Sequence, residues 1–513
     1  MSTKIAFIGA GIATSYTLIP FLDSLRKEKT NSKIELFVID KSNDFFKGMP
    51  YGNRSGKSVL LIQDLKNFIT EPHRTHFKNW LDANVDDLVK EFIKNGGKYA
   101  TKWANINSPF YKKGQWDDLF IPRFFFGRYI NQEVLERIDF LVEKKKLTLT
   151  YIQKETVSIS KERNDFCIHF ENNSTIKIDK IVLSIGSLPY KKLYKNKIEN
   201  SKNALYIKEP YGLGMEGNIE RIVEFLNDRK ANKLNTKIAV LGANASGLEM
   251  IYKICDKLNI NEYDATFKTL SSHGIMPDGT FDPVNAKKFK AKNLQLLTRS
   301  KNLSASAIAE AAHKDIDEAE KQGLGAATTV GIISKGFGAL LPNLSKEELL
   351  NFACFHGNQI GRRQRCAGRH YLSVIEELSN RNRFEHLKGR FQNLTESSDG
   401  LLLTYTNDKS PNSTEKSEAF NIVINCLGSV DLSSVDLSPF LKNLVESGLC
   451  KPNPSNIGFK VDENMQASEN LFIAGPLLAG NQIEDKIFWH LEHCARIIWS
   501  SSVLSNKIID SME

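Results

Sequence analysis

The stretch IAFIGAGIATSYTL, residues 5–18, passes from a continuous apolar run through two glycines into an amphipathic segment. A continuous apolar run is typical of a parallel strand that is covered on both faces. Gly9 permits a tight turn, and Gly11 lets a pyrophosphate approach the backbone at the N-terminus of the next helix. Thr14 stands where the last glycine of the usual pattern packs helix against strand. The stretch therefore predicts a nucleotide-binding turn that comprises Gly9, Gly11, Ile12, Ala13 and Thr14.

An acidic residue farther along the chain supports this interpretation. The next apolar run, IELFVID at residues 34–40, predicts a second parallel strand that ends in Asp40. A carboxylate at this place is suited to bind the ribose hydroxyls of a dinucleotide. Short glycine patterns also occur by chance, so a strand, turn and helix without a nucleotide site is the alternative.

The composition limits the class of protein. The chain has 513 residues, of which 41% are apolar and 25% charged, as in a globular protein of about two to four domains. The net charge of +9 is small for this length, and the lysines are scattered. Anionic small molecules such as nucleotides are therefore favoured as partners over nucleic acid.

Location and redox chemistry are also constrained. No apolar run is long enough to predict a membrane span, and the N-terminus enters a strand without room for a signal peptide. The seven cysteines form neither a C-x-x-C pair nor a metal-ligand spacing. We therefore expect a cytoplasmic protein with reduced thiols and no metal site. A mechanism that uses a redox-active dithiol is disfavoured.

A second stretch, KIAVLGANASGLEMIYKICDKL at residues 237–258, repeats the order of strand, glycine turn and helix. Its turn keeps the outer glycines, Gly242 and Gly247, with Ser246 beside the latter, but Asn244 replaces the middle one. The repeat predicts a second dinucleotide site. The alternative is a structural relic, because Asn244 stands where the backbone comes closest to phosphate. No acid ends the following strand, which favours NADPH over NADH.

The remaining segments read as insertions. Residues 50–150 and 303–385 look helical, whereas 147–190 and the segment after 400 look like β-meanders. The expected fold is α/β, with two Rossmann-like dinucleotide-binding units that carry β-meander and helical insertions.

Six motifs spread over nearly the whole chain resemble the two-dinucleotide-binding flavoproteins. More narrowly, they resemble the bacterial FAD/NAD(P)-binding protein family that includes flavin-dependent urate hydroxylases. Flavin-containing and ornithine N-monooxygenases look like more distant relatives. The motifs are FIGAGIAT with Asp40, the segment 50–81 beginning PYGNRSG, FIPRFFFGRYI (120–130), IVLSIGSLP (181–189), VINCLGS (423–429), and LFIAGPLLAG (471–480) followed by Glu484.

The resemblance implies that the chain binds FAD and NADPH. It divides the chain into an FAD-binding domain (1–210), a second nucleotide-binding-like domain with a helical insert (235–392), and the C-terminal part of the FAD-binding domain (393–513). It also implies that the last helix begins near Ile483, just after the glycine loop, and points its positive end at the flavin. The further cofactor-binding residues that it implies are Gln63, Arg123, Gly186, Gly428, Gly475, Gly480 and Asn481.

This sequence departs from the family pattern at several positions. Gln63 replaces the usual asparagine, and Pro476 follows Gly475 where many flavoproteins have an aspartate. Arg123 is interpreted as a ligand of FAD phosphate or of the flavin-side loop, and a surface ion pair is the alternative.

Other polar residues are open to two interpretations. A basic group could hold a 2′-phosphate or an anionic substrate, and a solvated helix face is the alternative. The isolated histidines are interpreted as structural or exposed, and no catalytic base is assigned. The basic group comprises Arg299, Lys301, Arg362, Arg363, Arg365 and Arg369, and the histidines are His273, His356 and His370.

The expected function is that of an FAD-dependent oxidoreductase, specifically an NADPH-dependent monooxygenase that hydroxylates a small polar or anionic molecule. A flavin dehydrogenase or oxidase without nicotinamide is one alternative, and Asn244 favours it. A flavin-binding redox-responsive protein without turnover is another. No role in binding nucleic acid or membrane is expected.

Overall fold

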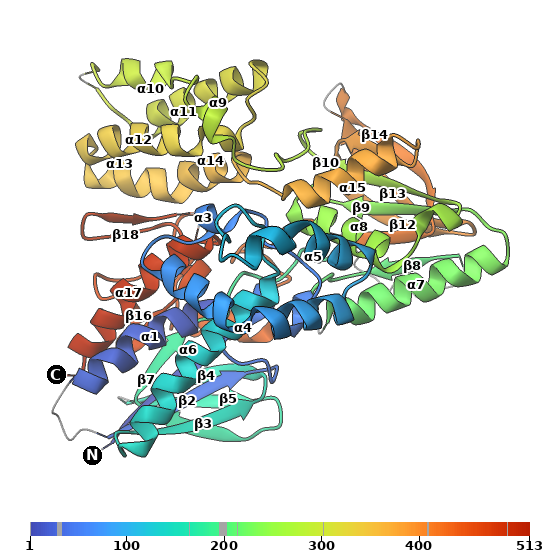
Figure 1. Ribbon diagram of the computed structural model, residues 1–513. Coiled ribbons are helices and arrows are strands. Elements are labelled where there is room, and N and C mark those ends of the chain that lie inside the picture. Colours follow the sequence, from blue (N-terminus) through green and yellow to red (C-terminus); the bar gives the residue numbers. More distant parts are fainter. Residues whose placement is uncertain are drawn as a thin grey trace.

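The computed structural model describes residues 2–27, 33–163, 165–193, 203–212, 214–300, 302–407, 410–489 and 491–512 (Figure 1). Two mainly parallel sheets form two units, and a helical insert lies above the C-terminal segment. This arrangement confirms the predicted α/β class with two Rossmann-like units. No helix within the described ranges combines the length and hydropathy that a bilayer span requires.

The first unit is built on a six-stranded sheet in the order β16-β17-β7-β1-β2-β3. All its pairings are parallel except that between β16 and β17. Register places Ile8, Ile39, Leu183 and Ile473 in one row near the carboxyl edge. Residues that follow these four strands therefore meet there. The strands are β1 (Thr3–Ile8), β2 (Ile34–Asp40), β3 (Leu147–Gln153), β7 (Lys180–Leu183), β16 (Gln466–Ser468) and β17 (Leu471–Ile473).

Three helices from distant parts of the chain pack together on this sheet. Helix α1 (Ile12–Lys27) contacts both α6 (Arg123–Glu143) and the terminal helix α17 (Cys494–Asp510). A small antiparallel sheet of β4 (Thr156–Glu162), β5 (Asp165–Phe170) and β6 (Thr175–Ile178) packs beside α16 (Pro439–Glu446). The strands contribute the centre of an apolar core that removes this sheet from water.

The segment between β2 and β3 is helical, as predicted, and has its own aromatic core. Phe77, Trp116, Phe125 and Phe126 are all fully buried in it. Such rings bury large apolar areas and so fix the loops that lead back to the sheet. Its elements are α2 (Gly48–Tyr51), η1 (Asn53–Ser55), α3 (Leu65–Phe68), α4 (His73–Asn95), α5 (Lys98–Tyr111) and α6.

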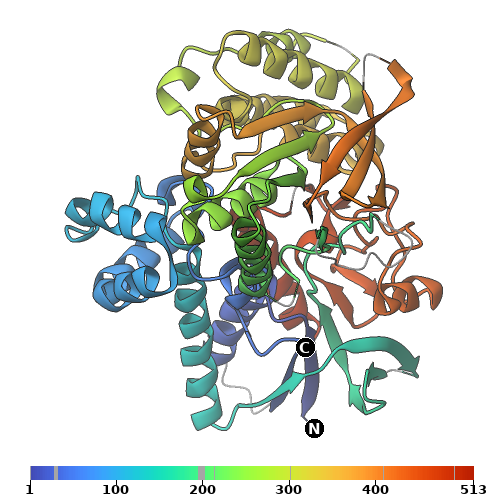
Figure 2. The same ribbon diagram turned by 90° about the vertical axis from the view of Figure 1, so that its right-hand side faces the viewer.

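The second unit has a parallel sheet in the order β11-β10-β9-β15-β8. Helices α7 (Met215–Ala231), α8 (Ala245–Lys257) and α15 (Arg369–Ser379) pack on it, and an antiparallel sheet of β12–β14 adjoins it (Figure 2). The strands are β8 (Leu205–Ile207), β9 (Thr236–Leu241), β10 (Ala265–Ser271), β11 (Phe384–Lys388), β12 (Arg390–Ser397), β13 (Gly400–Asn407), β14 (Ser410–Phe420) and β15 (Ile422–Asn425).

These sheet memberships correct two predicted boundaries. Strand β8 lies in the second sheet, so the first part of the FAD-binding domain ends before residue 210. Strands β12–β15 also belong to the second unit, so the C-terminal part begins after residue 425 and not at 393. The sequence could not place these boundaries, because the residues of a buried strand do not indicate which sheet the strand joins.

The two chain segments that connect the units run side by side. Val430 N–H donates to the carbonyl of Pro189 at 2.8 Å, and Tyr190 and Ser429 form an antiparallel bridge. One segment leaves β7 and the other leaves β15, so both carboxyl edges converge on this paired linker.

The helical insert lies above the hairpin that includes β18, as Figure 1 shows. Its apolar core contains Phe337, Phe352 and Trp489, of which Trp489 comes from the C-terminal segment. The insert is thereby anchored on the first unit. Its elements are α9 (Pro283–Ala286), α10 (Lys292–Leu297), α11 (Ala305–Lys321), η3 (Ala327–Thr329), α12 (Val330–Leu340), η4 (Leu341–Asn343), α13 (Lys346–Asn351), the π-helix η5 (Phe352–His356) and α14 (Gly357–Arg363).

The C-terminal segment differs from the prediction. Helix η6 (Gly475–Leu478) is followed by a hairpin of β18 (Asn481–Ile483) and β19 (Lys486–Phe488), and only then by α17. The expected helix start near Ile483 is therefore wrong. Glu484 has a φ of +54°, a conformation suited to a tight hairpin turn, and the turn reverses the chain before a helix can form.

Candidate cofactor sites and active-site corner

The first glycine turn has the geometry that its sequence predicts. Gly9 has a φ of +95°, and a Cβ there would lie 2.4 Å from the carbonyl oxygen of Ser184, so only glycine fits. Thr14 is fully buried, and its hydroxyl group contacts both the carbonyl of Gly9 and the hydroxyl of Ser184. The threonine therefore joins helix α1 to the ends of β1 and β7 and leaves the outer side of the turn clear.

The N-terminus of α1 has backbone donors that its own helix does not use. The first-turn amides of Ile12 and Ala13 have no acceptor within the helix. Gly48 lies opposite, with a φ of +69°, and a Cβ on Gly11 would sit 3.5 Å from the Gly48 Cα. The close contact of two glycines keeps Cβ atoms away from this helix N-terminus, which suits the approach of a pyrophosphate. Gly48 was not among the predicted residues, although its place within FFKGMPYG, before an aromatic segment, was a usable signal.

Asp40 lies beside this turn at the carboxyl end of β2. One carboxylate oxygen accepts from the Ala10 amide at 2.9 Å, and the other accepts from the amide and hydroxyl of Ser42 at 2.8 and 2.9 Å. A carboxylate has about four acceptor positions, so lone pairs remain for ribose hydroxyls. The side chain is half-buried and fits the predicted contact.

Three further glycines, Gly186, Gly428 and Gly475, were predicted to bind a cofactor. Gly475 brings the loop after β17 against α1, because a Cβ there would lie 3.0 Å from the Cβ of Ala13. Gly186 and Gly428 lie in the two linker segments, where a Cβ would meet no atom within 4 Å. Gly475 therefore lies at the first turn, whereas the two linker glycines border open space.

Gly480 and Asn481 have structural contacts instead of the predicted position before a helix. Asn481 is 4% exposed, and its amide donates to the carbonyls of Phe459 and Leu478 at 2.7 and 2.9 Å. A Cβ on Gly480 would collide with Ser455. The amide group of Asn481 is thus used to fasten the C-terminal loop, and the prediction that these residues open the terminal helix is wrong.

Helix α17 nevertheless begins at a corner that contains a predicted residue. Its N-cap residue, His493, places Nε2 at 3.2 Å from Oε1 of Gln63, which comes from the opposite end of the chain. Burial lowers the pKa of His493 to about 4, with a further contribution from Arg496, so the imidazole is neutral at pH 7. Cys494 is buried and contacts Tyr51. We call Gln63, Trp489, His493 and Arg496 together the candidate active-site corner.

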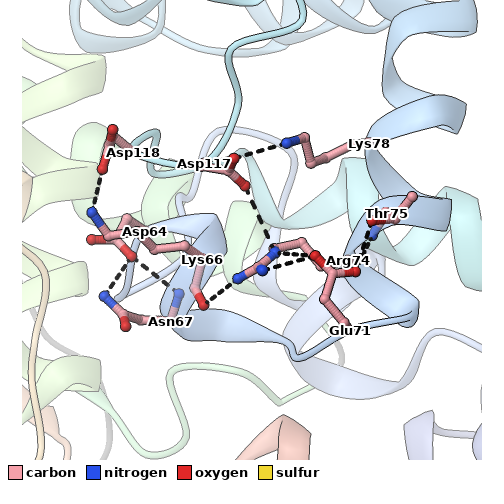
Figure 3. A network of polar contacts seen from close by, with 9 residues as sticks. All are labelled: Asp64, Lys66, Asn67, Glu71, Arg74, Thr75, Lys78, Asp117 and Asp118. Atoms are coloured by element: carbon pink, nitrogen blue, oxygen red, sulfur yellow. Dashed lines mark hydrogen bonds and ion pairs between the residues drawn. The ribbon is translucent and has the colours of Figure 1, made fainter.

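Polar contacts fix the segment that carries Gln63 (Figure 3). Asp64 caps α3 by accepting from the amide of Asn67, and Lys66 pairs with Asp118. Asp117 accepts a hydrogen bond from Lys78 at 2.8 Å and forms an ion pair with Arg74 at 3.8 Å. Exposed pairs of this kind contribute little singly, but the network joins the start of α4 to the loop before α6. The segment that directly follows Gln63 is therefore fastened to this loop.

The second glycine turn also forms. A Cβ on Gly247 would lie 2.1 Å from the carbonyl oxygen of Gly242, so helix and strand are in close contact. Asn244 caps α8: its carbonyl oxygen accepts from the Gly247 amide at 3.1 Å, and its NH₂ group donates to the Cys426 carbonyl at 2.8 Å. The asparagine thus occupies one of the amides that a phosphate would use. Ser246 lies beside the Tyr211 phenol.

The strand after this turn ends without a carboxylate. The hydroxyl of Ser271 lies 2.8 Å from Nε2 of His386, and Lys388 stands beside Ser271 in the register of β10 and β11. His273 follows and is exposed. The surroundings of this strand end are therefore polar to basic, in line with the sequence.

Arg123 lies in a buried ion pair between the two units. Its guanidinium contacts the carboxylate of Glu249 at 2.6 Å, and its Nε donates to the carbonyl of Leu60 at 2.9 Å. Glu249 on α8 is fully buried and also accepts from the hydroxyls of Tyr211 and Tyr371, at 2.9 and 2.8 Å. Burial lowers the pKa of Arg123, but Glu249 more than reverses this and raises it above its ordinary value. The alternative of a surface ion pair is wrong, and the sequence carried no sign of this partner.

The basic group does not converge on one site. Arg363 pairs with Asp317 and Glu320 at 2.6 and 2.9 Å, and Arg365 pairs with Glu492. Arg299 and Arg362 are exposed, and Lys301 lies outside the described residues. Arg369 borders a cavity of about 290 Å³ together with Asp278, Thr280 and Glu376, among others.

The remaining predicted features agree with structural roles. His370 packs against Tyr371, with ring centroids 4.0 Å apart, and burial followed by the charge of Arg123 lowers its pKa to about 3. His356 is half-buried. All seven cysteines are buried free thiols.

Comparisons with known proteins agree with this geometry. A family model described as FAD-NAD(P)-binding matches residues 6–188. Uncharacterized proteins of Mycobacterium tuberculosis and Mycobacterium bovis are 28% identical to the chain over 515 residues, which cover 99% of it and 96% of each relative.

Among solved structures, an ornithine hydroxylase from Pseudomonas aeruginosa superposes with a TM-score of 0.53 at 12% identity and 100% coverage of both chains. An L-lysine 6-monooxygenase from Pseudomonas syringae gives 0.53 at 11% identity, also with 100% coverage of both. A cadaverine monooxygenase from Erwinia amylovora, solved with FAD, gives 0.52 at 11% identity over 99% of this chain and 94% of that one. Residues 6–188 are thus similar to the FAD-NAD(P)-binding family, and the whole chain shares the fold of these three enzymes, with two Rossmann-type units.

Proposed function

We propose that this chain is an NADPH-dependent FAD monooxygenase that hydroxylates a small polar or anionic molecule. One observation carries the proposal. Gly9 contacts Ser184 at the root of one linker, Gly242 contacts Cys426 at the root of the other, and the linkers are hydrogen-bonded to each other. Two dinucleotides in these turns would therefore extend toward one shared region, which a hydride transfer between them requires.

The first turn has the groups that FAD needs. Gly11 and Gly48 would flank its pyrophosphate, the first-turn amides of α1 would donate to it, and Asp40 would accept from the ribose hydroxyls. When bound, FAD would supply hydride acceptance from NADPH and activation of dioxygen for transfer of one oxygen atom to the substrate. The residues of the chain would bind and orient the reacting molecules and exclude water from them.

The second turn supports NADPH, bound more weakly. Ser246 and Gly247 lie at the start of α8, where a phosphate meets the helix N-terminus. Asn244 occupies the Gly247 amide, which reduces the number of donors available. Lys388 and the absence of a carboxylate at the end of β10, within the described residues, favour a 2′-phosphate over a free 2′-hydroxyl.

The comparisons support oxygen transfer over other flavin chemistry. The three solved structures described above are named as an ornithine hydroxylase, a cadaverine monooxygenase and an L-lysine 6-monooxygenase. The seven cysteines are free and buried, which offers no exposed dithiol for a reductase mechanism. Asn244 alone favours the second candidate, a flavin dehydrogenase or oxidase that takes electrons from its substrate and binds no nicotinamide.

Anaerobic stopped-flow spectroscopy of the FAD-loaded protein tests this function. We expect NADPH to bleach the flavin absorbance, and NADH to do so more slowly at equal concentration. A substrate screen would then measure NADPH oxidation in air and the hydroxylated product. Bleaching by an organic substrate but by neither nicotinamide would establish the dehydrogenase, and no bleaching by any donor would establish a flavin-binding protein without turnover.

A further inference from the structure

Arg496 carries a positive charge that no carboxylate of the described structure balances. It is the third residue of α17, is half-buried, and makes one hydrogen bond, from its guanidinium to the carbonyl of Trp489 at 3.1 Å. Its Cζ atom lies 4.1 Å from the centroid of the Trp489 ring. A guanidinium has five N–H donors, so about four are left after this bond.

Two physical effects oppose a cation at this place. A helix N-terminus carries a partial positive charge, so an arginine in the first turn is repelled where a carboxylate would be stabilised. Burial also lowers the pKa of Arg496, to about 10, and no acid counteracts this shift. Glu492, the acidic residue nearest in sequence, pairs with Arg365 instead. Throughout the described ranges no carboxylate pairs with Arg496, so an anion from outside the chain would compensate all of these costs.

The free donors of Arg496 are not sealed off from solvent, since the residue is only half-buried. None of the Arg496 nitrogens is among the fully enclosed unpaired atoms of the described residues. The stacking partner is rigid, because the Trp489 ring packs against Phe337 and Phe352, at 5.9 and 5.8 Å, and closely against Gly357. These three residues belong to the helical insert. The guanidinium is therefore held at the contact between the insert and the first unit.

Neutral polar groups adjoin the cation. The imidazole of His493 precedes it by three residues, and Oε1 of Gln63 lies 3.2 Å from Nε2 of that ring. Burial keeps this histidine uncharged at pH 7. The ring therefore adds no charge to the site, but it can donate or accept one hydrogen bond. The candidate active-site corner thus combines one fixed cation with hydrogen-bonding groups and an aromatic platform.

We infer that Arg496 binds the carboxylate group of the substrate, so that the substrates of this protein are small carboxylates. The inference rests on the proposed function, since it assigns the anion to the molecule that is hydroxylated. A reduced flavin is the other possible source of negative charge near a helix N-terminus. The substrate is favoured because the Trp489 platform belongs to the core of the insert and not to the sheet that carries the nucleotide turn.

Matched pairs of probes that differ only in the carboxylate test the inference. The pairs are L-lysine with cadaverine, L-ornithine with putrescine, and benzoate with benzyl alcohol. Binding to the oxidised, FAD-loaded protein is followed by flavin absorbance and by tryptophan fluorescence at constant ionic strength. We expect a carboxylate probe to bind more tightly than its partner. Arg496→Gln should lower that affinity about 10- to 100-fold, as loss of a charged hydrogen bond does, and should leave the carboxylate-free partner unaffected.

Two further variants separate binding from structural effects. Arg496→Lys keeps the charge and should restore part of the affinity. Lys507→Gln removes a cation from the far end of the same helix, where it pairs with Glu484 at 3.0 Å, and should change nothing. The flavin reduction potential is measured in all of them. An unchanged potential with lost carboxylate affinity supports the inference.

Two results would overturn the inference. One is that no carboxylate probe binds in a way that depends on Arg496. The other is a lowered potential with unchanged probe affinities, which would assign the cation to the reduced flavin. The titration needs no turnover, so its failure is distinct from failure of the proposed function, which anaerobic reduction by NADPH measures separately.

Discussion

Replacing Glu249 with glutamine tests whether a buried ion pair holds the two nucleotide units together. The carboxylate accepts from Arg123 on α6 and from the phenols of Tyr211 and Tyr371, so it joins both units at one point. Glutamine has nearly the same volume but no charge, and it presents an NH₂ group where the carboxylate has a second acceptor oxygen. The change therefore removes the counter-charge of Arg123 without creating a cavity.

The free-energy cost follows from the burial of both partners. The side chain of Glu249 is 0% exposed and that of Arg123 is 11% exposed. Loss of one partner from a buried pair costs roughly 3–5 kcal/mol, because the other charge stays buried and unpaired. The glutamine oxygen still accepts one hydrogen bond, so we expect about 3 kcal/mol, near the lower end of that range. A solvent-exposed pair would contribute at most about 1 kcal/mol.

Urea unfolding, followed by tryptophan fluorescence and circular dichroism, measures this cost as a shift of the first transition. Glu262→Gln is the matched control, because Glu262 pairs with Lys230 at 3.0 Å with both side chains exposed. Combining Glu249→Gln with Arg123→Met should destabilise less than the sum of the single changes, since no unpaired charge remains. If Glu249→Gln costs no more than Glu262→Gln, the pair is solvated and the reasoning fails.

Three further outcomes follow from the site. Gly11→Val should abolish FAD binding, because its branched methyl groups would press against the Gly48 backbone and obstruct the helix N-terminus; the flavin absorbance per protein measures this, with Gly11→Ala as the milder change. Asn244→Gly should leave NADPH affinity unchanged or raise it, because it frees the Gly247 amide. A weaker affinity in stopped-flow titration would contradict the proposal that Asn244 occupies a donor that NADPH needs. The third concerns His493, whose pKa is lowered to about 4 from an ordinary 6.5 by burial and then by Arg496. The unfolded chain takes up this proton first, so the contribution to stability is complete above pH 6.5 and is lost as the pH falls toward 4. Unfolding free energies between pH 7 and 4.5 should therefore fall more steeply in the parent protein than in His493→Gln, and equal slopes would count against the burial of this ring.

Local patterns in the sequence predicted where the two glycine turns form. Gly9, Thr14 and Asp40 lie where the order of strand, turn, helix and acid places them, because each position is set by neighbours within one βαβ unit. The helical segments were also recognisable from their periodicity. Features of this kind need no knowledge of which distant segment packs against them. Of the β-meander expected over 147–190, only 156–178 forms an antiparallel sheet, whereas 147–153 and 180–183 are parallel strands of the first unit.

Long-range features could not be read in the same way. The partner of Arg123 is Glu249, and no local pattern connects α6 with α8. The membership of β15 in the second sheet depends on pairing with β9, which an apolar run does not disclose. The late start of α17 was missed because the glycine loop suggested a helix, whereas the alternating residues of 481–488 and the turn at Glu484 form a hairpin.

The two glycine turns depart from the usual pattern at different positions, and the difference bears on what each binds. In the first turn the substituted residue, Thr14, points inward to the ends of β1 and β7 and leaves the phosphate side clear. In the second turn the substituted residue, Asn244, is exposed and occupies an amide at the helix start. We therefore expect the first site to retain its cofactor and the second to bind and release its ligand. That division suits a resident FAD and a hydride donor that must leave after each reduction.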